Sequence, residues 1–273
     1  GVYLEFKRRQ LKWDARVSCF LLDFQEQQRP RTYYLESGFG EGLVTEHLRR
    51  PRVAIKGFEG RFKTRLNPTS SLEVGFQFRD DSWGQNADLI WHQRAGATRG
   101  VLPPQTTRFI GQANIKGLSR GNGPQSALGI RWDYRSPDRW WLQTGLHFLW
   151  NNSVALAPSK YSSSFSLSPD RPDFEAFTNE ELEFLRRREN LPKAGYIHIS
   201  GGKSWRNGNR YTSLFLSLQN LTDLRVPTGG FEQGRVGHAE LAAEEKGSGT
   251  PLFGNKYWVG QGRSFFLNLS MSY

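Results

Sequence analysis

Apolar and polar residues alternate with a two-residue period along much of this 273-residue chain, and this pattern constrains its fold more than any other feature. Residues 58–66 and 72–79 are clear examples. Alternation of this kind predicts β-strands that have one apolar and one polar face. No segment approaches the ~18 consecutive apolar residues that a membrane-spanning helix requires. We therefore expect an all-β protein.

The connections between the expected strands alternate strictly between short and long. Tight turns lie at 67–70, 135–138 and 207–209, and long connections lie near 24–51, 84–124, 152–193 and 221–256. About nine strands remain, near 1–8, 13–23, 52–66, 71–83, 125–134, 140–151, 194–206, 210–220 and 257–273. In an antiparallel up-and-down barrel, this alternation places all short turns at one rim and all long loops at the other.

Aromatic residues are abundant, at 14% of the chain with nine Trp, and they gather near the strand ends. One group lies next to the short turns: Trp13, Trp140, Trp141, Trp205, Tyr211 and Tyr273. A second group lies near the long connections: Trp83, Trp150 and Trp258. About ten residues of tilted strand separate the groups, which matches the ~25 Å apolar band between the aromatic girdles of an outer-membrane barrel. The sequence therefore predicts a transmembrane β-barrel.

An odd number of antiparallel strands cannot close into a barrel, and a bare strand edge in lipid leaves backbone groups without hydrogen-bond partners. We therefore expect residues 1–273 to be the C-terminal part of one barrel domain. The remaining strands are expected from upstream sequence, and no plug domain is expected within the chain.

The polar residues of the strands are expected to line the lumen of the barrel. This set comprises Arg16, Glu59, Arg61, Lys63, Arg79, Arg131, Asp133, His147 and His198. The net charge is +11, but the basic residues are scattered rather than clustered, so nucleic acid is not an expected partner.

No motif in the chain indicates catalysis, a metal or a cofactor. The five histidines are widely spaced, Cys19 is the only cysteine, and no phosphate-binding loop or nucleophile elbow occurs. His147 and His198 are weighed as members of a catalytic set at the barrel rim, but a lumen-lining role is favoured. We therefore expect no enzyme activity, no cofactor and no metal site.

The long connections carry the candidate structure and chemistry outside the barrel. Residues 88–118 are expected to form a hairpin, and residues 178–190 a helix capped by Thr178 with Arg186 to Arg188 complementing its dipole. Ligand capture is expected from loop residues that combine stacking surfaces with hydrogen-bonding groups: Trp91, His92, Arg94, Glu232, Arg235, Tyr257 and Trp258.

Several short motifs, in their order and spacing, resemble those of TonB-dependent outer-membrane receptors of the bacteroidete type. Residues 220–223 (Asn-Leu-Thr-Asp) resemble the motif that closes the penultimate strand in that family. Further resemblance is found at 123–137, 177–182, 191–192, 228–235, 253–258 and 265–273.

The resemblance implies a 22-stranded barrel in the outer membrane of a Gram-negative bacterium, with an N-terminal plug and import of a scarce nutrient. It also implies several partners: outer-membrane lipid, the plug and remaining strands of the same receptor, the TonB complex through the N-terminal part, and, as a candidate, a surface lipoprotein. The last strand resembles the signal read by the barrel assembly machinery through β-augmentation, carried by Phe265, Leu267, Leu269, Met271 and Tyr273.

Two other interpretations stay open at this point. One is a barrel subunit that does not transport and serves as a scaffold in an outer-membrane assembly. The other is a soluble carbohydrate-binding β-sandwich, since sandwich strands alternate in the same way.

Overall fold

A computed structural model describes residues 1–25, 30–35, 42–95, 105–121, 123–165, 177–237 and 253–272. The chain is all-β, built almost entirely from antiparallel strands with one short α-helix. Within the described ranges, no helix has the length and apolar character needed to cross a membrane.

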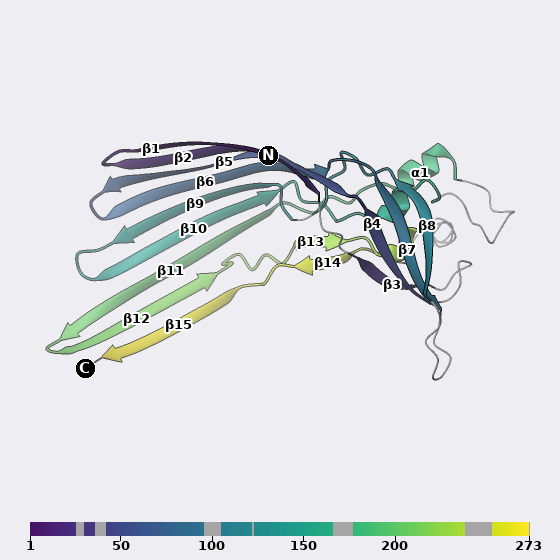
Figure 1. The fold of residues 1–273 in the computed structure, drawn as a ribbon. Helices are drawn as coiled ribbons and strands as arrows, with labels where there is room; N and C mark the ends of the chain where they lie inside the picture. The colour runs from purple at the N-terminus through teal and green to yellow at the C-terminus, as the bar shows by residue number, and fades with distance from the viewer. Residues whose placement is uncertain are drawn as a thin grey trace.

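Nine strands form one curved antiparallel sheet, here called the long sheet, in which chain order is also spatial order (Figure 1). Its strands are β1 (Val2–Arg9), β2 (Trp13–Gln25), β5 (Arg52–Asn67), β6 (Ser70–Trp83), β9 (Ser126–Arg135), β10 (Trp140–Trp150), β11 (Ala194–Asn207), β12 (Arg210–Gln219) and β15 (Ser264–Ser272). Eight of the nine strands predicted from the sequence are thereby confirmed with small shifts at their ends, and the ninth is confirmed only in its C-terminal part, β15.

Short turns join β1 to β2, β5 to β6, β9 to β10 and β11 to β12 at one end of the long sheet (Figure 1). The connections at the other end are long and carry all the remaining elements. The predicted separation of short and long links is therefore confirmed.

One face of the long sheet, here called the apolar face, is mostly apolar across the nine strands, and among the described residues ion pairs such as Lys56 with Asp80 lie on it only near the head. The register brings Leu4, Cys19, Phe58 and Phe78 side by side, and likewise Leu142 beside Tyr134. Its side chains are largely uncovered, and the following are at least 40% exposed: Val2, Leu4, Phe6, Val17, Leu21, Phe58, Phe62, Phe148, Leu216, Phe265, Leu267, Leu269 and Met271.

The opposite face, here called the polar face, carries ion pairs between neighbouring strands. Glu73 of β6 pairs with Arg131 of β9 at 2.8 Å and with Arg61 of β5 at 3.4 Å. Arg131 also reaches Asp133 at 3.2 Å. Opposite charges on adjacent strands thus neutralise one another across this face.

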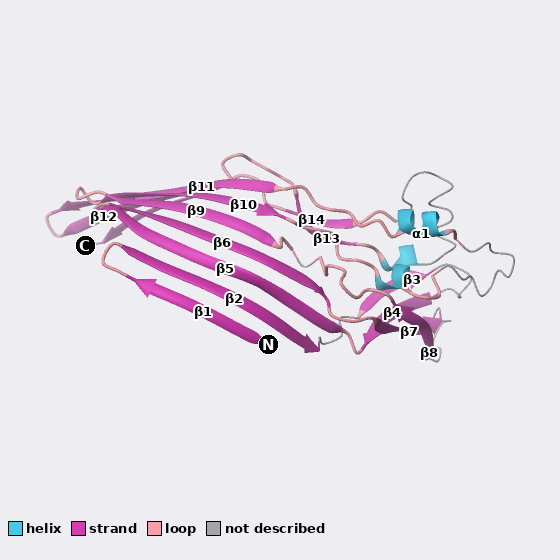
Figure 2. Ribbon diagram, turned by 90° about the horizontal axis from the view of Figure 1, so that it is seen from above, coloured by secondary structure: helices cyan, strands magenta, loops and turns pink. Residues whose placement is uncertain are grey.

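The long sheet is open, with β1 and β15 as its two edges. No other described sheet is stacked on either of its faces (Figure 2). The backbone groups along the outer edges of β1 and β15 have no strand partner among the described residues.

The long connections fold into a second body, here called the head. It contains a four-stranded sheet of β3 (Arg31–Leu35), β4 (Gly42–Arg49), β7 (Ala87–Ala95) and β8 (Gln105–Ala113), in that order. It also contains the hairpin of β13 (Pro227–Phe231) and β14 (Lys256–Val259), two 3-10 turns, η1 (Pro158–Tyr161) and η2 (Gly234–Gly237), and helix α1 (Asn179–Leu185).

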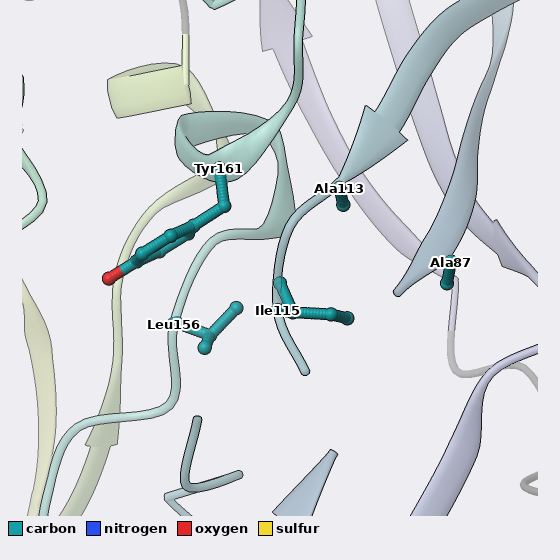
Figure 3. Close-up of a cluster of buried hydrophobic side chains, with 5 residues drawn as sticks. All are labelled: Ala87, Ala113, Ile115, Leu156 and Tyr161. Carbon is teal, nitrogen blue, oxygen red and sulfur yellow. The ribbon is translucent and has the colours of Figure 1, made fainter. Parts of the chain in front are cut away.

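Small hydrophobic clusters hold the head together. Ala87 and Ala113 of the β7–β8 hairpin pack with Ile115, Leu156 and Tyr161, which come from two different long connections (Figure 3). The hydroxyl of Tyr161 donates to the carbonyl of Arg186 at 2.9 Å. Burial and the nearby charge of Glu232 raise the pKa of Tyr161 to about 12, so this phenol stays protonated.

Three details of the head differ from expectation. The hairpin predicted within 88–118 is confirmed, but its strand β7 pairs with β4, which in turn pairs with β3, and both β3 and β4 lie in a segment predicted to be a loop. The last predicted strand is divided into β14, which pairs with β13 in the head, and β15 in the long sheet.

The predicted helix at 178–190 is shorter than expected. Thr178 caps it as predicted, through a capping box with Glu181. It ends at Leu185, and Arg186 uses its Nε to bind the carbonyl of Lys160 at 2.8 Å instead of the helix's own carbonyls. The arginines therefore anchor the helix to neighbouring segments rather than complement its dipole.

Candidate functional site

A cleft of about 430 Å³ lies in the head and draws its walls from all four long connections. We call it the head cleft. Residues 30–33, Glu46, Leu48, Pro51, Trp83, Arg120, Ala155, Pro158, 231–234 and Trp258 line it. Convergence of segments so far apart in sequence is typical of ligand sites in loops carried by a rigid scaffold.

Two of the charged groups that line the head cleft are held in buried ion pairs. Glu232 is 5% exposed; its carboxylate pairs with Lys160 at 3.0 Å and accepts the backbone N–H of Ala157 at 2.7 Å. Arg120 pairs with Asp81 at 3.2 Å and lies over the Trp83 ring. These pairs fix the walls, because breaking either one would leave an unpaired buried charge.

Glu46 is the most deeply buried acid of the head cleft, at 2% exposure. It points inward from β4 and accepts the hydroxyl of Tyr33 at 3.5 Å. Burial raises the pKa of Glu46, and the positive charge of Arg31 opposes the shift without cancelling it. Burial also raises the pKa of Tyr33 well above its usual value, so that side chain remains a hydrogen-bond donor.

The aromatic wall is formed by the β13–β14 hairpin. Phe231 and Trp258 lie with their ring centroids 5.6 Å apart and are 37% and 57% exposed. Gly229 lies beside the Trp258 ring, where an added Cβ would come within 2.9 Å of it. The two rings are tilted by 45° to each other, and each offers a partly exposed face that can stack against a planar group.

Arg31 stands at the start of β3 on the same cleft. Its Nη1 donates to the backbone carbonyl of Glu232 at 3.5 Å. Glu232 directly follows Phe231 in the sequence. No carboxylate in the described part of the protein forms an ion pair with Arg31. The five donors of a guanidinium are therefore mostly unused here.

Some of the residues predicted to bind a ligand line the head cleft, and the others lie elsewhere in the head. Trp91 is a correction: it is 2% exposed and packs with Val44 and Leu89, because odd-numbered residues of β7 point into the head. His92 lies on the outer face of the same sheet, where its Nδ1 hydrogen-bonds Thr107 at 2.9 Å. Arg94 belongs to β7, and its side chain lies outside the described residues.

Of the others, Glu232 and Trp258 line the head cleft as expected for ligand residues. Tyr257 donates its hydroxyl to Glu189 at 2.6 Å, and Arg235 lies over the Phe253 ring at 5.0 Å. Both contacts hold the loops together and do not line the cleft.

The predicted lumen-lining residues share the polar face, as the register shows. Arg16 pairs in register with Arg61, Lys63 with Glu73, and Gly129 with His147. A broad hollow of about 800 Å³ lies on this face against β1, β2, β5, β6, β9 and β10. The sheet is open in the described residues, so the hollow lacks walls on one side. It is therefore not a complete binding site.

The fold brings histidines together that are distant in sequence. His147 and His198 lie 5.1 Å apart, and His47 and His92 lie 4.8 Å apart, measured between ring centroids. The Nδ1 of His198 accepts the backbone N–H of Asn220, which places the proton of a neutral ring on Nε2. No described group of three or more His, Cys, Asp or Glu residues is arranged to hold a metal.

Four of the five residues predicted to form the barrel-assembly signal lie in β15. Leu267 and Leu269 pair with Leu216 and Leu214 on the apolar face, and Phe265 and Met271 continue the same row. Tyr273 lies outside the described residues.

The sequence prediction missed Arg31, Glu46 and Phe231. A signal for Glu46 was present, since Val44, Glu46 and Leu48 share one side of β4 with the buried positions. Nothing local linked that strand to the β13–β14 hairpin more than 180 residues away. Comparison of the chain with protein-family models, with curated proteins and with solved structures found no match.

Proposed function

We propose that this chain is the barrel portion of a TonB-dependent receptor of the Gram-negative outer membrane, which imports a scarce nutrient captured at the head. The observation that carries this proposal is the separation of faces across all nine strands of the long sheet. Its outward residues are largely apolar and uncovered, while its inward residues are mostly polar, with ion pairs on β1 to β9.

Uncovered apolar residues on this scale are unfavourable in water and favourable in lipid. Each apolar Å² moved out of water is worth about 25 cal/mol, so a large bare apolar face marks a surface that meets lipid or another protein. The polar face and its ion pairs then line the interior of the barrel, and strands from elsewhere pair with the edges of β1 and β15.

The head supports the receptor part of the proposal. It stands at the end of the long connections, which in an outer-membrane barrel face outside the cell. The head cleft has both aromatic and charged walls. A soluble β-sandwich is less well supported, because no described second sheet covers the apolar face.

The membrane part is tested by expressing the full-length protein in a Gram-negative host. We expect it in the outer-membrane fraction, with heat-modifiable mobility in gels. A protein that is soluble without detergent would contradict the proposal. Recovery of a folded barrel that fails to support ligand uptake would favour the non-transporting scaffold.

A pair of neighbouring substitutions tests the assignment of faces. Leu216 pairs with Leu267 on the apolar face, and Ser217 points to the polar face. Leu216→Arg is expected to cost about 2–4 kcal/mol in the free energy of unfolding from lipid, because it places a charge near the middle of the bilayer. Ser217→Arg should cost much less, and equal costs would show that the faces are wrongly assigned.

A further inference from the structure

The head cleft contains one positive charge that is not neutralised by an ion pair among the described residues. Glu232 is paired with Lys160, and Arg120 with Asp81. Arg31 makes a single long hydrogen bond to a backbone carbonyl. Glu46 lies near enough to Arg31 to interact electrostatically, yet burial disfavours its ionised form.

The cleft also places this charge beside a stacking surface. The carbonyl that Arg31 contacts belongs to Glu232, the residue directly after Phe231. Phe231 and Trp258 form the partly exposed aromatic wall, and all three side chains line the same cleft. A guanidinium next to an aromatic surface favours ligands that carry both a negative group and a flat ring.

We propose that the head cleft binds a small organic anion with a planar ring, whose carboxylate or phosphate is held by Arg31 and whose ring stacks on Phe231 and Trp258. The volume of about 430 Å³ suits a ligand of this size. This inference names a ligand class for the receptor proposed above and rests on that function for its biological meaning.

The test uses the purified full-length protein in detergent micelles and saturation-transfer NMR, which detects weak binding. The probes are phenyl phosphate and benzoate, which carry both features, with benzyl alcohol and methyl phosphate as probes that lack one feature each. We expect both aromatic anions to bind, and each single-feature probe to bind at least about tenfold more weakly. The stronger of the two anions identifies the preferred acid group.

Substitutions link binding to the cleft. Arg31→Gln is expected to weaken binding of both aromatic anions about tenfold, because the charged hydrogen bonds are lost. Arg49→Gln removes an exposed arginine from the end of β4, outside the cleft, and should leave binding unchanged. Trp258→Leu, at a residue that is 57% exposed, should weaken binding without affecting folding.

Each contrary outcome overturns a defined part of the inference. Absence of binding by both aromatic anions overturns it entirely, as does unchanged binding by Arg31→Gln. Equal binding of benzyl alcohol removes the role of the negative group, and equal binding of methyl phosphate removes the role of the ring. Failure of the barrel proposal would appear separately, as a protein without heat-modifiable mobility, whether or not the anions bind.

Discussion

At the scale of single residues, Glu46 places a carboxyl group among the most buried positions of the head. Its pKa is raised by burial, so the folded head binds a proton more readily than the unfolded chain does. The resulting stabilisation is fully present below the unfolded pKa of about 4.5 and is lost as the pH rises through the folded pKa. The head should therefore loosen as the pH rises across that interval.

Glu46→Gln removes this dependence. At pH 8, we expect the amides of β4 to exchange hydrogen more slowly in the variant than in the natural protein. After correction for the intrinsic exchange rates, this difference should shrink as the pH falls towards 4.5. Glu183→Gln, in helix α1 outside the cleft, is the matched control. Weaker protection in Glu46→Gln at pH 8 would show that the charge stabilises the head through Arg31 and Tyr33.

At the scale of elements, Asn220 forms the corner where β12 ends and the chain turns into the head. It is 4% exposed and has a positive φ of 50°. Its Nδ2 donates to the carbonyls of Leu224 and Gln261, at 2.9 and 2.8 Å. Its Oδ1 accepts the backbone N–H of Leu224 and the hydroxyl of Thr222, both at 3.1 Å. One side chain thus ties together the segments before β13 and before β15.

Asn220→Ala should destabilise this corner by about 2–4 kcal/mol, since it loses these bonds and leaves a residue with a Cβ at positive φ. Asn220→Gly should lose less, because glycine adopts positive φ freely. The measurement is hydrogen exchange at 221–226 and 260–263. Equal protection in the two variants would mean that backbone conformation contributes nothing at this position.

The elements also differ in how far the sequence predicts them. The long sheet follows from local alternation, because each strand shows its two faces in its own residues. Strands β3 and β4 were missed because β4 is stabilised by pairing with β7, 39 to 53 residues later, and β3 is held in turn by β4. Trp91 was misplaced for the same reason: its burial depends on Val44, which belongs to another connection.

At the scale of the whole molecule, charge is unevenly distributed around the polar face. Strands β1 to β9 of the long sheet carry most of the charged residues of this face and, in the described part of the chain, all of its ion pairs, including Glu73 with Arg131, and β11 adds Arg206 near its short turn. The polar faces of β10, β12 and β15 carry none; the aromatic rings of Trp141, Phe215 and Phe266 lie there in a row. The interior of the proposed barrel would therefore have a charged side and a neutral side.

Whether lipid or water contacts the apolar face concerns the whole sheet, and the rate at which Cys19 is chemically modified distinguishes the two. This only cysteine is exposed and lies beside Phe58 and Leu4 on that face. In lipid, we expect a charged, water-soluble thiol reagent to modify Cys19 at least about tenfold more slowly in the folded protein than in the unfolded chain, because the reagent does not enter the apolar region. Rapid modification of the folded protein would place this face in water.

The head cleft takes its walls from segments that begin near residue 30 and end near residue 258. Contacts between such distant segments form late in folding, since the loop-closure entropy of the whole chain opposes them. An intact cleft therefore exists only in molecules whose assembly is nearly complete. A ligand bound there would stabilise fully assembled molecules over partly assembled ones by mass action, and in the proposed receptor the supply of ligand would thereby lengthen the lifetime of correctly built protein.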